Sequence, residues 1–147
     1  MLSRTDLHKI SRTRLKEAKV LLRSRLYDGA KYILGYSLET AFKARICKIL
    51  DSDYPDRGDL SKTFFTHKFD TLVILSGLEK LIDAQKYKDP YFAVNWSLLT
   101  DPTSASVWKE TLRYEKIGTA TLAEVKALIL ALEDKDHGVL TWIMRKW

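Results

Sequence analysis

The sequence predicts an all-α protein: an up-and-down helical bundle with extra short helices toward its C-terminal end. Apolar residues recur at helical spacing, capping signals precede several of these stretches, and no segment of useful length alternates apolar and polar residues as a β-strand does. The chain has 147 residues, 46% of them hydrophobic and 30% charged, which is enough for one hydrophobic core. We therefore expect a single domain over residues 1–147.

The first helix is expected from Thr5 to Arg25, and it concentrates the positive charge. Residues 1–25 hold eight Lys or Arg and two acidic residues, whereas the other 122 residues hold 17 of each kind, so the net charge of +6 belongs to this segment. One face repeats cations at a 3–4–3–4 spacing: Lys9, Arg12, Lys16, Lys19 and Arg23. Such a stripe can contact the phosphates of a nucleic acid. The alternative is the solvated face of an amphipathic helix.

The second helix is expected to begin after Tyr27–Gly29, with Asp28 as its N-cap, and to end near Asp51. Apolar residues occur on nearly all of its sides, so we expect other helices to surround it. Small and branched residues form a seam for a close neighbour: Ala30, Ile33, Leu34, Ser37, Leu38 and Ala41. A second face stacks four residues along one side: Tyr32, Tyr36, Glu39 and Lys43. This face is either a ligand-binding site or part of the packing.

The rest of the chain predicts one loop and several shorter helices. A loop is expected over 51–60, followed by a helix from His67 to Ser76 capped by Thr66 and a helix from Leu78 to Lys86. Asp89-Pro90 then starts a helix that reaches Leu99, and the segment from Val107 to Tyr114 is either helical or irregular. The capping box Thr121–Glu124 starts a helix that reaches Leu132, and a last helix is expected from Val139 to Trp147. The four tryptophans are interpreted as core or interface residues: Trp96, Trp108, Trp142 and Trp147.

Several classes of function lack their sequence signals. Cys47 is the only cysteine, the histidines show no metal-ligand spacing, and no glycine-rich phosphate loop occurs, so we predict neither a metal nor a cofactor. No apolar run approaches the roughly 18 residues of a membrane span, and the N-terminal residues do not form a secretory signal. A cytoplasmic protein without a membrane partner is therefore expected.

Residues 5–114 resemble the HEPN family of small α-helical domains. The resemblance rests on the order and spacing of residues in the first two helices, on Thr66-His67-Lys68-Phe69, and on the late dipeptide Arg113-Tyr114. It implies an up-and-down bundle, commonly a homodimer, that handles RNA or nucleotides. Many such domains are metal-independent ribonucleases of toxin–antitoxin and phage-defence systems, and share an Arg and a His separated by four to six intervening residues. That motif is absent around all three histidines of this chain.

We therefore predict a non-catalytic or degenerate HEPN-like domain that binds RNA, a nucleotide or a partner protein, such as an antitoxin or a nucleotidyltransferase. The ligand-binding candidates are Tyr32, Tyr36, Glu39, Lys43, Lys68 and Tyr114. One alternative is a ribonuclease with His67 as the base and Arg113 or Lys43 as the cation. A histidine at the start of a helix is more often a capping or packing residue, which is the other interpretation of His67. A second alternative is a structural module that docks another protein through its tryptophan-rich C-terminal half.

Overall fold

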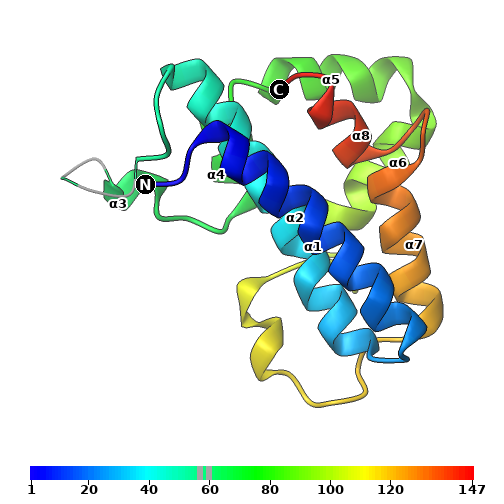
Figure 1. The fold of residues 1–147 in the computed structure, drawn as a ribbon. Coiled ribbons are helices and arrows are strands. Elements are labelled where there is room, and N and C mark those ends of the chain that lie inside the picture. Colours follow the sequence, from blue (N-terminus) through cyan, green and yellow to red (C-terminus); the bar gives the residue numbers. More distant parts are fainter. Residues whose placement is uncertain (56–57, 59–60) are drawn as a thin grey trace.

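The computed structural model describes residues 1–55, 58 and 61–147, and all regular structure in this part of the chain is helical (Figure 1). The predicted all-α class is confirmed. The elements are α1 (Arg4–Arg23), α2 (Tyr27–Leu50), α3 (Ser61–Phe64), α4 (Phe69–Leu75), α5 (Glu79–Lys88), α6 (Pro90–Thr100), the 3₁₀ helix η1 (Glu110–Tyr114), α7 (Leu122–Glu133) and α8 (Val139–Met144). Within the described ranges, no helix has the length and apolar composition needed to cross a bilayer.

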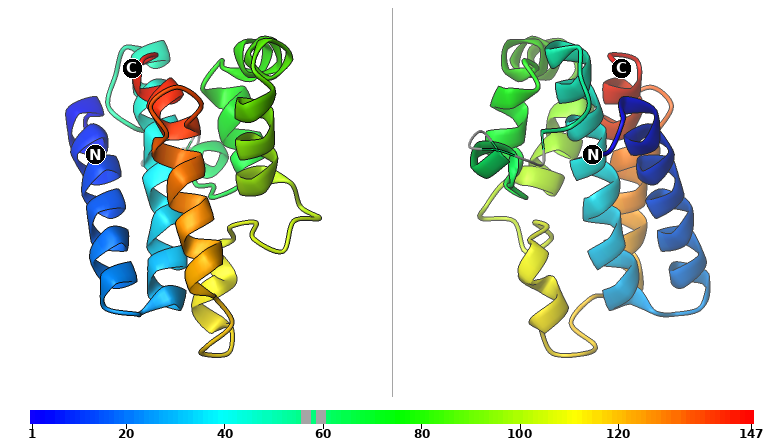
Figure 2. Two further views of the ribbon diagram at one scale, coloured as in Figure 1. Left: turned by 90° about the vertical axis from the view of Figure 1, so that its right-hand side faces the viewer. Right: turned by 60° about the vertical axis from the view of Figure 1, so that its left-hand side comes forward.

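The longer helices form the predicted up-and-down arrangement. The helices α1, α2 and α7 lie side by side, and α6 packs against α7 (Figure 2). In chain order α1, α2, α6 and α7 alternate in direction, while α3, α4 and α5 are inserted between α2 and α6. The short helices η1 and α8 follow α6 and both pack against α2. The extra short helices late in the chain are therefore confirmed as well.

Helix α2 is the central helix, as its apolar composition predicts. Five of the six seam residues are buried, and the sixth, Ile33, is half-buried against the core. The small seam residue Ser37 lets α1 approach closely: Ser11 Oγ donates to the carbonyl of Ser37 at 2.7 Å, and Ser37 Oγ donates to the carbonyl of Ser11 at 2.8 Å. Because both hydroxyls are buried, these two reciprocal hydrogen bonds fix the position at which the two helices cross.

A largely shielded ion pair attaches α7 to the other side of α2. Lys31 Nζ lies 2.7 Å from Glu124 Oε1, and both side chains are largely shielded from solvent. Glu124 is also the acidic member of the predicted capping box, in which its backbone N–H donates to Thr121 Oγ1. The predicted cap at Asp89, with Pro90 in the first turn, is confirmed in α6. The tryptophans pack inward: Trp108 and Trp142 are buried, and Trp96 and Trp147 are partly buried against the core.

Several helix boundaries in the structure differ from the predicted ones. Helix α1 ends at Arg23 rather than Arg25, since Arg25 adopts a left-handed conformation with φ 61°. Helix α2 begins at Tyr27 with Leu26 as its N-cap, and the carboxylate of Asp28 instead accepts hydrogen bonds from the 118–120 loop. Because the Asp28 carboxylate accepts hydrogen bonds from this loop, it does not cap the first N–H groups of α2.

The third and last predicted helices are shorter than expected. Helix α4 begins at Phe69, with Lys68 as its N-cap, so Thr66 and His67 lie before it. Thr66 Oγ1 accepts the backbone N–H of Lys68 and thereby shapes the preceding turn. The C-terminal helix ends at Met144 rather than Trp147. Of the predicted 51–60 loop, residues 56, 57, 59 and 60 lie outside the described residues.

Candidate functional site

A buried carboxylate connects the face of α2 to the segment before α4. Glu39 is only 2% exposed, and each of its oxygens has a cationic or imidazole partner. Oε1 accepts from Lys43 Nζ at 2.7 Å, one helical turn away, and Oε2 lies 2.9 Å from Nδ1 of His67. An unpaired carboxylate at this depth would be costly, so the two contacts account for its burial. The structure thus brings three sequence-predicted candidates together.

The contact with Glu39 also fixes the chemistry of His67. An ionised carboxylate can only accept hydrogen bonds, so when Glu39 is ionised the donor of this contact is Nδ1 of His67. In the neutral ring Nε2 is then left as an acceptor, which is the form that a general base requires. The side chain of His67 is 37% exposed, so solvent reaches the ring. In the His67–Glu39 pair, a carboxylate orients a histidine that could act as a base, and Lys43 lies beside them.

The two tyrosines of this face form a packed pair rather than a free stacking platform. The hydroxyls of Tyr32 and Tyr36 lie 2.9 Å apart. The ring of Tyr36 makes edge contacts with Trp108 on one side, at 5.1 Å between centroids, and with His67 at 6.2 Å. Burial, with a smaller contribution from Tyr32, raises the pKa of Tyr36 to about 12. Trp108 further fixes the pair, since its Nε1 donates to the carbonyl of Tyr32 at 2.8 Å.

Arg113 reaches the same cluster from its far side. Its guanidinium lies 3.5 Å from the hydroxyl of Tyr32 and 4.9 Å above the ring of Tyr114, which is 78% exposed. Tyr32 and Tyr36 therefore connect Arg113 to His67 through a chain of contacts. The cation that shares a carboxylate with His67 is Lys43. Lys68 is exposed beside His67 at the start of α4.

Two hollows meet at His67. A small cavity of about 170 Å³ has Lys43 and His67 on one side and three aromatic rings among its walls: Tyr54, Phe64 and Phe65. The ammonium of Lys43 lies 5.3 Å above the ring of Tyr54, and burial raises the pKa of the Tyr54 hydroxyl. A larger groove of about 620 Å³ runs from His67 and Lys68 past Trp96 and Trp108 to the side chains of α5. The groove has the volume of a typical ligand site, and the small cavity is below that range.

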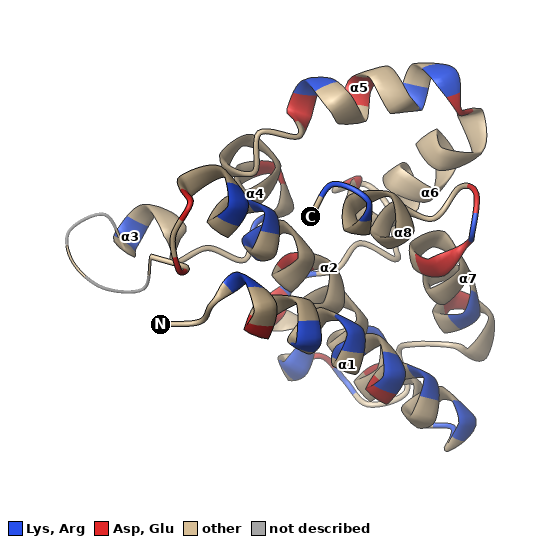
Figure 3. Ribbon diagram, turned by 45° about the horizontal axis from the view of Figure 1, so that its top comes forward, with Lys and Arg blue, Asp and Glu red and all other residues tan. Residues whose placement is uncertain are grey.

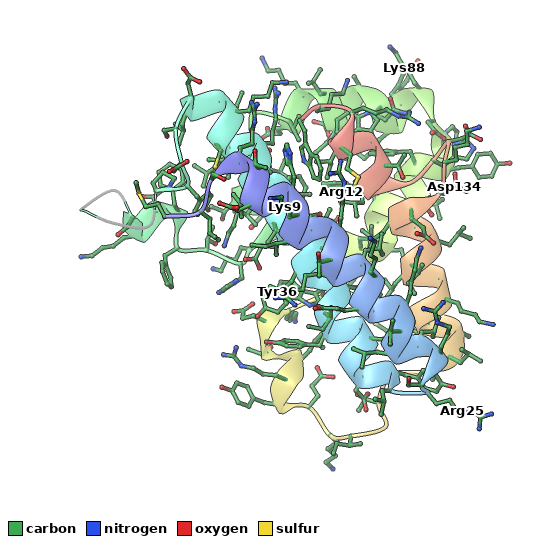
Figure 4. The ribbon with its side chains drawn as sticks, viewed as in Figure 1. Lys9, Arg12, Arg25, Tyr36, Lys88 and Asp134 are labelled. Carbon is green, nitrogen blue, oxygen red and sulfur yellow. The ribbon has the colours of Figure 1, made fainter. Side chains whose placement is uncertain are left out.

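The basic stripe of α1 lies along a different set of neighbours. Lys19 forms an ion pair with Glu133 of α7, and the guanidinium of Arg12 lies 5.2 Å above the ring of Trp147. Lys9, Lys16 and Arg23 are exposed and form neither a hydrogen bond nor an ion pair with any described residue. Figure 3 shows that Lys and Arg recur along the length of α1. Figure 4 shows Lys9 and Arg12 on α1 and Tyr36 beside η1.

The structure adds residues that sequence reasoning missed. Tyr54, Phe64 and Phe65 wall the small cavity, and Trp108 covers the tyrosine pair. Tyr54 stands in an aperiodic loop, so no helical spacing points to it; its burial and its hydrogen bond to the carbonyl of Phe64 are tertiary features. The local signal for Tyr54 is a large aromatic residue alone in a polar loop, between Asp53 and Pro55. Such a residue is a candidate for burial with its hydroxyl hydrogen-bonded.

The site contains groups suited to acid–base chemistry or to anion binding. Among the described residues, no three His, Cys, Asp or Glu side chains are placed to hold a metal ion. The HEPN resemblance and the roles of these residues stay predictions.

Searches of protein-family models, of curated proteins and of solved structures find nothing that matches this chain.

Proposed function

We propose that the protein binds single-stranded RNA through the basic face of α1 and acts without catalysis. The observation that carries this proposal is the set of exposed cations Lys9, Lys16 and Arg23, which form no hydrogen bond or ion pair within the part of the chain that the structure describes. Each phosphate that a cation neutralises releases counterions, so binding of this kind is steeply dependent on salt. Arg12 extends the stripe beside the indole of Trp147. An arginine next to an aromatic ring suits both phosphate contact and base stacking.

The test is the RNA affinity of a triple variant across a salt series. Replacing Lys9, Lys16 and Arg23 with Gln should weaken binding and reduce the slope of log K against log salt by about 2, at roughly 0.7 per contact for single strands. The matched control replaces three other exposed lysines at the α5 and α7–α8 end: Lys80, Lys88 and Lys135. Equal losses in both variants, or an affinity indifferent to salt, would refute the proposal.

A second candidate function is metal-independent RNA cleavage at His67. It is favoured by the hydrogen bond from His67 Nδ1 to the buried Glu39 and by the ammonium of Lys43 on the same carboxylate. In such a reaction Nε2 of His67 would take the proton of the attacking 2′-hydroxyl, and Lys43 would stabilise charge on the phosphorane. The bond from phosphorus to the 5′-oxygen would then break to leave a 2′,3′-cyclic phosphate, and the protonated His67 would return its proton to the leaving 5′-oxygen. The tyrosine pair would hold the imidazole in place.

Cleavage of total RNA by the purified protein and three variants decides between the two functions. If the enzyme hypothesis is correct, His67→Ala abolishes cleavage, Glu39→Gln lowers the rate by at least about 100-fold, and His137→Ala leaves it intact. If the unmodified protein does not cleave RNA, or if His67→Ala cleaves it unchanged, the enzyme hypothesis is refuted and the binding function stands.

A further inference from the structure

The small cavity beside His67 has an inner wall of two aromatic rings that are fixed in place. The hydroxyl of Tyr54 donates to the carbonyl of Phe64 at 2.8 Å, and the two rings meet edge to face, with 6.0 Å between their centroids. The backbone N–H of Tyr54 also donates to the carbonyl of Leu2 at 2.9 Å. Tyr54 is 7% exposed, whereas Phe65, which lines the same cavity, is 78% exposed. The cavity therefore combines a preorganised wall with an opening to solvent.

The size and lining of the cavity limit what it can hold. Its volume of about 170 Å³ is close to that of the apolar cavity of about 150 Å³ that takes up a benzene molecule. In the described part of the chain its lining is apolar apart from Lys43, Thr66 and His67, since the hydroxyl of Tyr54 is bonded to Phe64. The cavity thus fits a single six-membered ring with one small polar group. A nucleotide, with its base, sugar and phosphate, exceeds this volume.

The polar groups of the cavity favour a neutral ligand that donates a hydrogen bond. Nδ1 of His67 is bonded to the carboxylate of Glu39, so Nε2 is the nitrogen left for a ligand, and in the neutral ring Nε2 accepts. The ammonium of Lys43 lies 5.3 Å above the ring of Tyr54, where a cationic ligand would otherwise bind. Because Glu39 already neutralises Lys43, an anionic ligand would enter an apolar cavity without an unpaired cation.

We infer that the small cavity binds a small phenol, whose ring lies against Tyr54, Phe64 and Phe65 and whose hydroxyl donates to Nε2 of His67. A phenol joins one planar apolar ring to one neutral donor, which is the combination that the walls and the imidazole complement. None of the lining residues belongs to α1. The inference therefore rests neither on RNA binding by the basic face nor on RNA cleavage, and it uses none of the cations proposed to contact phosphate.

A pair of ligands that differ only in the hydroxyl tests the inference on the unmodified protein. In an NMR titration, p-cresol should shift the ring signals of Tyr54 and Phe64 and bind with a Kd below about 1 mM. Toluene has the same ring and methyl group without the donor, so it should bind about tenfold more weakly, as expected for the loss of one hydrogen bond. Benzylammonium should not bind detectably, because its charge would lie beside the ammonium of Lys43.

Two variants locate the ligand. His67→Ala should weaken p-cresol binding about tenfold and abolish the difference between p-cresol and toluene. The matched control is His137→Ala, whose imidazole is bonded to Asp89 outside the cavity and whose loss should change neither affinity. Phe65→Ala removes an exposed wall, so it should weaken both ligands and leave the circular dichroism unchanged.

Four results would each overturn the inference. They are no binding of p-cresol, equal affinities for p-cresol and toluene, a difference between the two ligands that survives in His67→Ala, and affinities that Phe65→Ala leaves unchanged. Binding of benzylammonium as tight as that of p-cresol would equally refute it, because the site would then select an aromatic ring and not a neutral donor.

Discussion

The indole ring of Trp108 packs directly against the backbone of Gly35, so a Cβ added to Gly35 would overlap that ring. Trp108 is buried, with its Nε1 bonded to the carbonyl of Tyr32 and its ring between Phe69 and Tyr36. The indole therefore cannot retreat without losing a buried hydrogen bond and two ring contacts. The absence of a side chain at Gly35 lets the 101–109 segment lie against the centre of α2, next to the candidate site.

Gly35→Ala should destabilise the protein by about 1–3 kcal/mol, because the added methyl group displaces the indole. Urea unfolding measures this loss. Gly29→Ala on the same helix is the matched control, since its Cβ would make only an ordinary 3.6 Å contact with Leu21. There the gain in helix propensity should leave stability unchanged or raise it by up to about 1 kcal/mol. Equal effects of the two substitutions would contradict the close packing of Trp108.

The helices could be predicted from sequence wherever their signals are local. The capping box at Thr121 and Glu124 and the Asp89-Pro90 start act over three or four residues, and both are found in the structure. Asp28 failed as a cap because its acceptors serve a loop 90 residues further along the chain. No spacing rule reports such a long-range hydrogen bond, so polar residues near helix ends are the least reliable signals.

The candidate site was predictable only in part, for the same reason. Glu39 and Lys43 form the predicted i,i+4 pair because one helix places both. The contact of Glu39 with His67 spans 28 residues and depends on how the chain returns to α2 before α4. The covering of the tyrosine pair by Trp108 spans more than 70 residues, and it turns an expected stacking platform into a packed cluster.

His137 should stabilise the fold more at acidic than at alkaline pH. Its Nδ1 lies 2.8 Å from Asp89 Oδ2, and this hydrogen bond raises the pKa of His137 above its ordinary value of 6.5. The stabilisation is thus complete below the unfolded pKa and lost as the pH rises through the folded pKa. The destabilisation caused by His137→Ala should therefore shrink between about pH 5.5 and about pH 8.5. Asn95→Ala, which removes a bond to the His137 carbonyl, should have an effect independent of pH.

His8 should destabilise the fold at acidic pH, which is the opposite of the effect of His137. Its ring stacks on Trp147 at 3.8 Å, and its Nε2 is buried without a hydrogen-bond partner in the described part of the chain. Burial, and then the charges of Arg12 and Arg4, lower the pKa of His8. Below pH 6.5 the unfolded chain therefore binds a proton that the folded chain does not, and stability falls. His8→Phe keeps the stacking and should make the urea midpoint less sensitive to acid; an unchanged acid dependence would contradict this account.

Glu39 and Lys43 should be energetically coupled, because Glu39 is buried and the side chain of Lys43 is only 15% exposed. Glu39→Gln and Lys43→Met should each cost about 2–4 kcal/mol, since each leaves a shielded charge without its partner. The double variant should cost less than their sum by at least about 1 kcal/mol, as measured by urea unfolding.

The matched control for this cycle is Asp83 and Lys86 on α5, a pair at 3.0 Å with side chains 64% and 36% exposed. Solvent screens that pair, so its coupling should not exceed about 0.5 kcal/mol. If Glu39 and Lys43 showed an equally small coupling, Lys43 would not be the group that neutralises the buried carboxylate. His67 would then carry that role alone, and its replacement by Ala would be the most destabilising change in the cluster.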